Sequence, residues 1–140
     1  MNKQAIRLKY KSKRAHITVK QRDEFSIKIA NNCLSLPIWE FSNYHIFLPI
    51  VNKLEVNTEF LLHVLQGKDK SIVVPKVLPK TSEMSHILLQ DNTPLKVSKQ
   101  GVPEPAAGVE IMISQLDVIF VQSFSIHGSC SYLIFRYCYS

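Results

Sequence analysis

Basic side chains recur at a helical spacing near the start of the chain. Lys3, Arg7, Lys11 and Arg14 would form one stripe along the surface of a helix. Such a stripe suits three roles: binding nucleotide phosphates, contacting a nucleic-acid backbone, or simply facing solvent. The sequence has no RNA-binding signature, and few aromatic residues interleave with the basic residues. We therefore expect no nucleic-acid partner.

Two further charged residues follow predicted strands. Glu55 comes after the apolar run 44–49, and Lys76 comes after the run 71–75. Open α/β sheets bind ligands beyond the carboxyl ends of their strands. A carboxylate there could accept hydrogen bonds from the amino group of a heterocycle, and a lysine could bind phosphate. On position alone, both residues are equally consistent with solvent-exposed loop charges.

Other common sites leave no trace in the sequence. We find no Walker loop, no GxGxxG fingerprint and no histidine cluster with metal-ligand spacing. His45 and His86 lie inside apolar runs, and we interpret each as a packed or surface histidine and not as a ligand. Cys33, Cys130 and Cys138 form neither an even disulfide set nor a close metal-binding pair, which predicts free thiols and no protein metal site.

The elements that would position these residues follow from periodicity and caps. A first helix carries the basic stripe, and Thr18-Val-Lys-Gln21 matches a capping box that begins a second helix. We expect the second helix to end near Leu36-Pro37. Its predicted core-facing positions are Phe25, Ile29 and Leu36, with Ile27 and Ala30 alongside, and Trp39 and Phe41 are predicted to anchor the following turn.

Short apolar runs predict strands at 44–49, 71–75, 84–90 and 116–121, the third of them towards a sheet edge. Asn57-Thr58 caps a predicted helix over 59–66, with Gly67 as its C′ residue. Strand, helix and strand in this order form a βαβ unit. The segment 91–115, rich in proline and glycine, is predicted to be a long loop. We therefore predict a three-layer α/β domain with a largely parallel sheet and flanking helices.

Composition is consistent with this assignment. The chain has 140 residues, 46% of them hydrophobic, and a formal net charge of +6, which favours anionic ligands. No apolar run is long enough to span a bilayer, and no secretory signal is recognisable. We expect one domain over residues 1–140, a monomer, located in the cytoplasm and away from membranes.

Taken together, the ordered motifs resemble the 5-formyltetrahydrofolate cyclo-ligase family, also called methenyltetrahydrofolate synthetases. Each motif is weak alone, but their order and spacing extend over about 120 of the 140 residues. The matching pieces are Lys3-x-x-x-Arg7 with Lys11 and Arg14, Tyr44-His-Ile-Phe-Leu-Pro49, Glu55-Val-Asn-Thr58, Gln66-Gly-Lys68, Val74-Pro-Lys76, Gly101-Val-Pro-Glu-Pro105 and Leu116-Asp-Val-Ile-Phe-Val121.

The resemblance implies an enzyme of folate one-carbon metabolism. Its reaction would close 5-formyltetrahydrofolate to 5,10-methenyltetrahydrofolate with ATP and Mg²⁺, releasing ADP and phosphate. By similarity, Lys3 and Arg7 would bind ATP and Glu55 would bind the folate. An apolar residue before Glu55 would line the pterin pocket; counting back from Glu55 favours Ile50, whereas aligning on Phe47-Leu48 favours Leu48.

The resemblance changes after Val121. The family continues with a proline and a loop of the form Gly-x-Arg-x-Gly-Tyr-Gly-x-Gly-Tyr-Tyr-Asp, whereas here Gln122 replaces the proline and only His127-Gly128 resembles the start of that loop. The loop arginine and the metal-binding aspartate have no equivalents in residues 122–140. We treat residues 122–140 as an anomalous tail, and the family's further C-terminal strands and helices are not found.

Two explanations for the tail stay open. A reading-frame disruption near codon 122 is favoured by the loss of every motif at one position. Alternatively, the chain is a diverged paralogue that binds folate or nucleotide without catalysis. Either way, we expect little or no turnover, and the apolar Tyr132-Leu-Ile-Phe135 is predicted to be prone to aggregation unless it packs as a strand.

Overall fold

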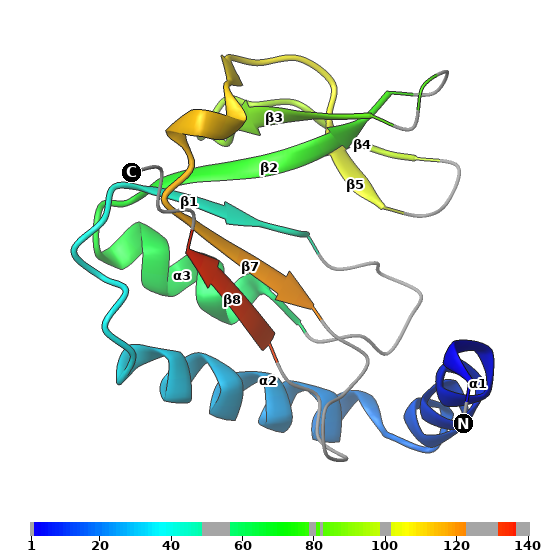
Figure 1. The fold of residues 1–140 in the computed structure, drawn as a ribbon. Helices are drawn as coiled ribbons and strands as arrows, with labels where there is room; N and C mark the ends of the chain where they lie inside the picture. The colour runs from blue at the N-terminus through cyan, green and yellow to red at the C-terminus, as the bar shows by residue number, and fades with distance from the viewer. Residues whose placement is uncertain are drawn as a thin grey trace.

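A mixed β-sheet forms the centre of the computed structural model, which describes residues 2–48, 57–78, 81, 83–98, 102–122 and 132–136 (Figure 1). Within these residues the strand order is β6-β3-β2-β1-β7-β8. The strands are β1 (Asn43–Ile46), β2 (Ser71–Val77), β3 (Met84–Leu88), β6 (Glu110–Ile111), β7 (Val118–Gln122) and β8 (Tyr132–Arg136).

The centre of the sheet is parallel and its two sides are antiparallel. β1 pairs in parallel with β2 and with β7, while β3, β6 and β8 add antiparallel pairs. The central strands are the ones predicted from continuous apolar runs, because a strand covered on both faces needs no polar alternation. Together with the helices below, this confirms the predicted α/β class, and β3 lies beside the short edge strand β6, as expected.

The helices in the described residues are α1 (Lys3–Ala15), α2 (Val19–Leu34) and α3 (Glu59–Gly67). The predicted capping box of α2 is confirmed: the Thr18 hydroxyl accepts a hydrogen bond from the Gln21 N–H, and the Gln21 side chain accepts one from the Thr18 N–H. α3 connects β1 to β2, which confirms the predicted βαβ unit. Among the described residues, no helix is long and apolar enough to cross a bilayer.

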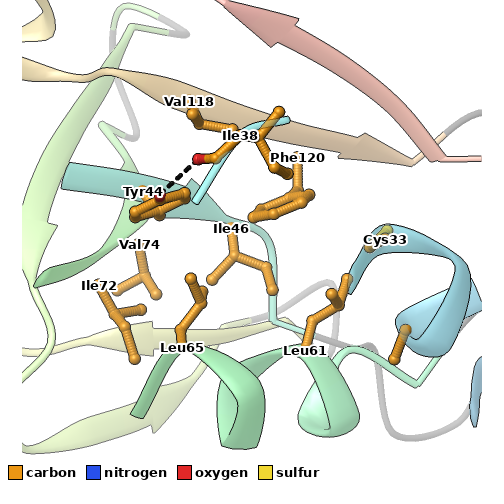
Figure 2. Close-up of a cluster of buried hydrophobic side chains, with 11 residues drawn as sticks. Cys33, Ile38, Tyr44, Ile46, Leu61, Leu65, Ile72, Val74, Val118 and Phe120 are labelled. Atoms are coloured by element: carbon orange, nitrogen blue, oxygen red, sulfur yellow. Dashed lines mark hydrogen bonds between the residues drawn. The ribbon is translucent and has the colours of Figure 1, made fainter. Parts of the chain in front are cut away.

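The hydrophobic core lies between the sheet and the helices α2 and α3, which cover the same face (Figure 1). Figure 2 shows Ile46 of β1 directed towards Leu61 and Leu65 of α3. Tyr44 is fully buried, and its hydroxyl donates a hydrogen bond to the Ile38 carbonyl at 2.6 Å. The other buried members are Ala30, Cys33, Ile72, Val74, Val118 and Phe120.

Trp39 and Phe41 pack against this core, as predicted. The Trp39 indole N–H donates to the Cys33 carbonyl at 3.0 Å, and the ring stacks on Tyr44 with 5.9 Å between centroids. Cys33 is a buried free thiol, as expected, and burial raises its pKa, which lowers its reactivity. Cys130 and Cys138 lie outside the described residues.

The predicted apolar face of α2 is wrong in detail. Phe25, Ile27 and Leu36 are exposed, whereas Ser26, Ala30 and Cys33 are buried. Close packing of α2 on α3 and the sheet selects the small side chains, because they let the backbones approach. Ile29 and Ala30 are the predicted positions that do contact the core.

The C-terminal end of α3 is also corrected. Gly67 is the last helical residue, and the left-handed C′ position is taken by Asp69, with φ 55°. The Lys70 N–H donates to the Leu65 carbonyl and the Asp69 N–H donates to the Gln66 carbonyl, the two bonds of a Schellman motif. Aspartate tolerates this conformation better than most residues, so the helix ends one residue later than predicted and its C′ position lies two residues later.

The predicted loop 91–115 contains a hairpin of β4 (Leu95–Val97) and β5 (Pro103–Pro105), followed by β6 and a 3₁₀ turn, η1 (Ile113–Gln115). Prolines are tolerated in β5 because the ladder bonds fall on other residues: the Ser98 N–H donates to the Val102 carbonyl and the Ala106 N–H to the Pro94 carbonyl. Pro103 and Pro105 pair at positions in between, where no N–H is needed.

Candidate functional site

The carboxyl ends of β1, β2 and β7 form the edge where a ligand is expected. β1 is followed by α3 and by β2 on one side of it, while β7 lies on its other side and is followed by β8, so the next strands after β1 and β7 lie in opposite directions along the sheet. Open α/β sheets bind their ligands at such a topological switch point, beyond the carboxyl ends of the strands. The geometry therefore places a candidate site just after Ile46 and Gln122.

Leu48, one of the two predicted apolar contacts, is described by the structure and lies at this edge. It is half-buried and packs against the core. Ile50 and Glu55 lie outside the described residues, so the choice between Leu48 and Ile50 as the pterin contact stays open. Asn57 is the next described residue along the chain, at the start of α3.

Lys76 lies inside β2 and not in a loop after it, because pairing with β3 continues to Val77 opposite Met84. Its ammonium group donates to the Ala106 carbonyl at 3.2 Å, and the neighbouring Val77 N–H donates to the Glu104 carboxylate at 3.4 Å. The interpretation of Lys76 as a solvated loop charge is therefore wrong. The lysine joins the end of β2 to the β4–β5 hairpin.

The basic stripe lies on α1 as predicted. Lys3, Arg7 and Lys11 are exposed, and neither Lys3 nor Arg7 makes an ion pair with another described residue. Figure 1 shows α1 on the side of the molecule towards which β1 and β7 point. The positive charges are thus available to an anion on the side of the predicted site.

Two imidazole rings, one buried and one half-buried, pack together on the other face of the sheet. His45 on β1 is 2% exposed, and its ring centroid lies 5.1 Å from those of His86 on β3 and of Phe47. Burial, and to a lesser extent the nearby charge of His86, lowers the pKa of His45 to about 4. His45 is therefore neutral at pH 7; of the two predicted alternatives, packed or surface, His45 is packed and His86 is half-buried against it.

Sequence reasoning missed two long-range connections, one at the amino-terminal ends of β1 and β7 and one at the start of α3. The Asp117 carboxylate accepts hydrogen bonds from the Ser42 and Asn43 N–H groups at 3.1 and 2.9 Å, which fixes β7 beside the start of β1. The Ser26 hydroxyl accepts a hydrogen bond from the Asn57 N–H at 2.9 Å. Both join residues far apart in sequence, so no local pattern could have revealed them.

The described residues contain no group of three or more histidine, cysteine, aspartate or glutamate side chains that could hold a metal ion. Mg²⁺ does not require such a group, because it keeps several waters and is commonly held by substrate phosphates and one or two carboxylates. The exposed stripe on α1 fits a polyphosphate better than it fits a free cation.

Comparison with known proteins identifies relatives of this architecture. The profile of the 5-formyltetrahydrofolate cyclo-ligase family matches residues 1–129, which extends past Val121. The chain is similar to the NMR structure of 5,10-methenyltetrahydrofolate synthetase from Aquifex aeolicus, with 28% sequence identity and a TM-score of 0.70 over 85% of this chain. The match spans 59% of the length of that synthetase. No curated protein sequence matches the chain.

Proposed function

The chain belongs to the 5-formyltetrahydrofolate cyclo-ligase family, and from that premise we propose that it binds 5-formyltetrahydrofolate beside ATP at the carboxyl edge of β1, β2 and β7. The observation that carries the proposal is the combination of the family match with an exposed cationic helix on that side of the sheet. The folate and the nucleotide would then occupy neighbouring parts of one crevice.

ATP would be bound by Lys3 and Arg7, supported by Lys11. A triphosphate carries several negative charges, and arginine binds phosphate through two parallel N–H groups. The amino-terminal end of a helix adds a partial positive charge, so Lys3 in the first turn of α1 strengthens the field. Mg²⁺ would be bound through the phosphates and would neutralise charge on them; we assign it no protein ligand.

The folate would be bound on the sheet side of the same crevice. Glu55 would accept hydrogen bonds from the pterin amino group, and Leu48 or Ile50 would pack on the ring. Leu48 lies suitably at the end of β1 and is already supported by the core, so it needs no rearrangement to present an apolar surface.

The chemistry of the family would be ring closure by phosphoryl activation. The formyl oxygen accepts the γ-phosphoryl group of ATP, the neighbouring ring nitrogen attacks the activated carbon, and phosphate leaves with the former formyl oxygen. ADP and 5,10-methenyltetrahydrofolate are the other products. Positive charge is needed because the transferred group spreads negative charge over its oxygens.

We further propose that residues 122–140 do not supply the family's phosphate loop, so that this chain closes the ring slowly or not at all. Gly128 is the one glycine among these residues, and close approach of backbone N–H groups to phosphate requires several. Tyr132–Arg136 instead forms the edge strand β8 beside β7. The predicted aggregation hazard is reduced where this segment pairs as a strand.

A side-by-side assay tests this part of the proposal. Formation of 5,10-methenyltetrahydrofolate is followed by its ultraviolet absorbance, with ATP and Mg²⁺, for this chain and for the Aquifex aeolicus synthetase. We expect the chain to be slower by about a hundredfold or more, because loss of preorganised phosphate contacts has effects of that order. Comparable rates for the two proteins would refute it.

A non-catalytic folate- or nucleotide-binding protein is the second candidate function. It is favoured by the same tail, since the described binding elements precede residue 122. Binding of 5-formyltetrahydrofolate without release of ADP distinguishes it from a slow enzyme. In both cases we propose a cytoplasmic monomer without a nucleic-acid partner.

A further inference from the structure

Two histidines on the sheet face opposite α2 and α3 lie close together without hydrogen-bond partners. The rings of His45 on β1 and His86 on β3 approach each other across β2, with 5.1 Å between their centroids. Both ring nitrogens of His45 and the Nδ1 of His86 are buried, and none of these atoms has a hydrogen-bond partner among the described residues. A buried polar atom without a partner costs free energy and is uncommon, so the pair calls for an explanation.

The neighbours of the two rings in the sheet offer no polar side chain. Four residues are paired with the histidines in the ladder, and all four are apolar: Val73 and Ile119 beside His45, and Pro75 and Ile111 beside His86. Side chains paired in this way lie on the same face of the sheet. The imidazoles are therefore the only polar side chains in this set, and one bound species between them would satisfy a nitrogen of each.

The spacing of the rings fits a small metal ion. A bond from Zn²⁺ to a histidine nitrogen is about 2.1 Å long, which places the ion about 3.2 Å from the centroid of each imidazole. At a tetrahedral angle the centroids would be about 5.2 Å apart, and the observed separation is 5.1 Å. A bridging water, with hydrogen bonds of about 2.9 Å, would hold the centroids about 6.6 Å apart. The observed spacing therefore favours a metal ion over a water.

The orientation of the rings is compatible with this ion as well. A metal ion lies close to the plane of each imidazole that ligates it, so the two ring planes must meet at the ion. The planes of His45 and His86 are 74° apart and do meet, whereas parallel stacked rings would not. His86 is half-buried and His45 is 2% exposed, so an ion would enter from the His86 side and complete its coordination there with water.

We propose that His45 and His86 form a Zn²⁺ site that links β1 to β3 across β2. Imidazole nitrogen suits zinc, whereas Mg²⁺ prefers oxygen ligands, so this site is distinct from the magnesium ion that accompanies ATP. The proposal does not depend on the proposed function. It revises the expectation from the sequence that neither histidine is a ligand and that the protein has no metal site of its own.

The test is a calorimetric titration of Zn²⁺ into the full chain at pH 7.5, after treatment with a chelator. His86→Phe replaces the half-buried ligand by another aromatic ring, and His63→Phe makes the same change at an exposed position on α3. We expect His86→Phe to weaken Zn²⁺ binding at least about tenfold relative to His63→Phe, because even groups that only orient a metal ligand contribute that much. An excess of Mg²⁺ should leave Zn²⁺ binding unchanged.

A second measurement on the unsubstituted chain decides the question if His86→Phe does not fold. Co²⁺ adopts the coordination of Zn²⁺, and tetrahedral Co²⁺ absorbs visible light much more strongly than the octahedral aqueous ion. We expect strong visible absorbance when Co²⁺ is added to the unsubstituted chain and to His63→Phe, and we expect excess Zn²⁺ to abolish it.

Equal Zn²⁺ affinities of His86→Phe and His63→Phe would overturn the inference, because the ion would then be bound elsewhere, for example by cysteine thiols. Absence of Zn²⁺ binding by the unsubstituted chain, or a Co²⁺ spectrum like that of the aqueous ion, would overturn it too. Binding of 5-formyltetrahydrofolate is measured separately, so failure of the zinc site leaves the proposed function standing.

Discussion

Replacing Lys3 and Arg7 together by glutamate is expected to weaken binding of an ATP analogue by about a hundredfold or more. Each side chain would lose a charge-assisted hydrogen bond to phosphate, and each new carboxylate would repel it. Both residues are exposed on α1, so the free protein should keep its stability. The affinity is measured by calorimetry, because binding does not depend on turnover.

The matched control places the same charges elsewhere. Lys9→Glu with Lys20→Glu changes the net charge equally, but Lys9 lies on the opposite side of α1 from the stripe and Lys20 lies on α2. We expect this control to lose only a little affinity for the ATP analogue, because the overall positive potential of the protein is weaker. That loss of affinity should shrink as salt is added. Equal affinities for the two double variants would remove Lys3 and Arg7 from the nucleotide site.

Acidification is expected to destabilise the fold by about 3 kcal/mol between pH 7 and pH 4, because of His45 alone. The imidazole is 2% exposed, and neither ring nitrogen has a hydrogen-bond partner among the described residues. Its pKa falls from 6.5 in the unfolded chain to about 4 in the folded one, chiefly because burial disfavours the charged form. Between pH 6.5 and pH 4 the His45 imidazole of the unfolded chain takes up a proton before that of the folded chain does. The contribution of neutral His45 to stability is therefore complete above pH 6.5 and is lost as the pH falls towards 4.

His45→Phe tests that assignment, since phenylalanine keeps an aromatic ring but cannot titrate. Urea unfolding at pH 7.5 and pH 5 should show a clearly smaller pH-dependent loss for His45→Phe than for the native chain. His63→Phe, at an exposed position on α3, should retain the native pH dependence. If His45→Phe lost as much free energy of unfolding between pH 7.5 and pH 5 as the native chain, other groups would be responsible for the acid sensitivity.

Local signals predicted the parts of the fold that are locally determined. The capping box at Thr18 and Gln21 lies within one helical turn, and the apolar runs of β1 and β7 specify buried strands by composition alone. The family resemblance added the order of the motifs and the candidate ligands. These predictions needed no knowledge of which residues meet across the sheet.

Features set by tertiary contacts were not predictable in the same way. The buried face of α2 follows from how closely that helix packs on α3, which favours Ser26 and Ala30 over the larger Phe25. The β4–β5 hairpin depends on the ladder register that spares Pro103 and Pro105. The hydrogen bond between Ser26 and Asn57 joins residues 31 positions apart. Such contacts carry no periodic signal in the sequence.

Calorimetric titration of 5-formyltetrahydrofolate into the full chain at neutral pH, with Glu55→Gln alongside, tests the central claim most directly. If the chain keeps the folate site of its family, saturable binding with one site is expected. Glu55→Gln should weaken it about tenfold or more, because a charged acceptor is lost. No measurable binding, or equal binding by the Glu55→Gln variant, would contradict the account.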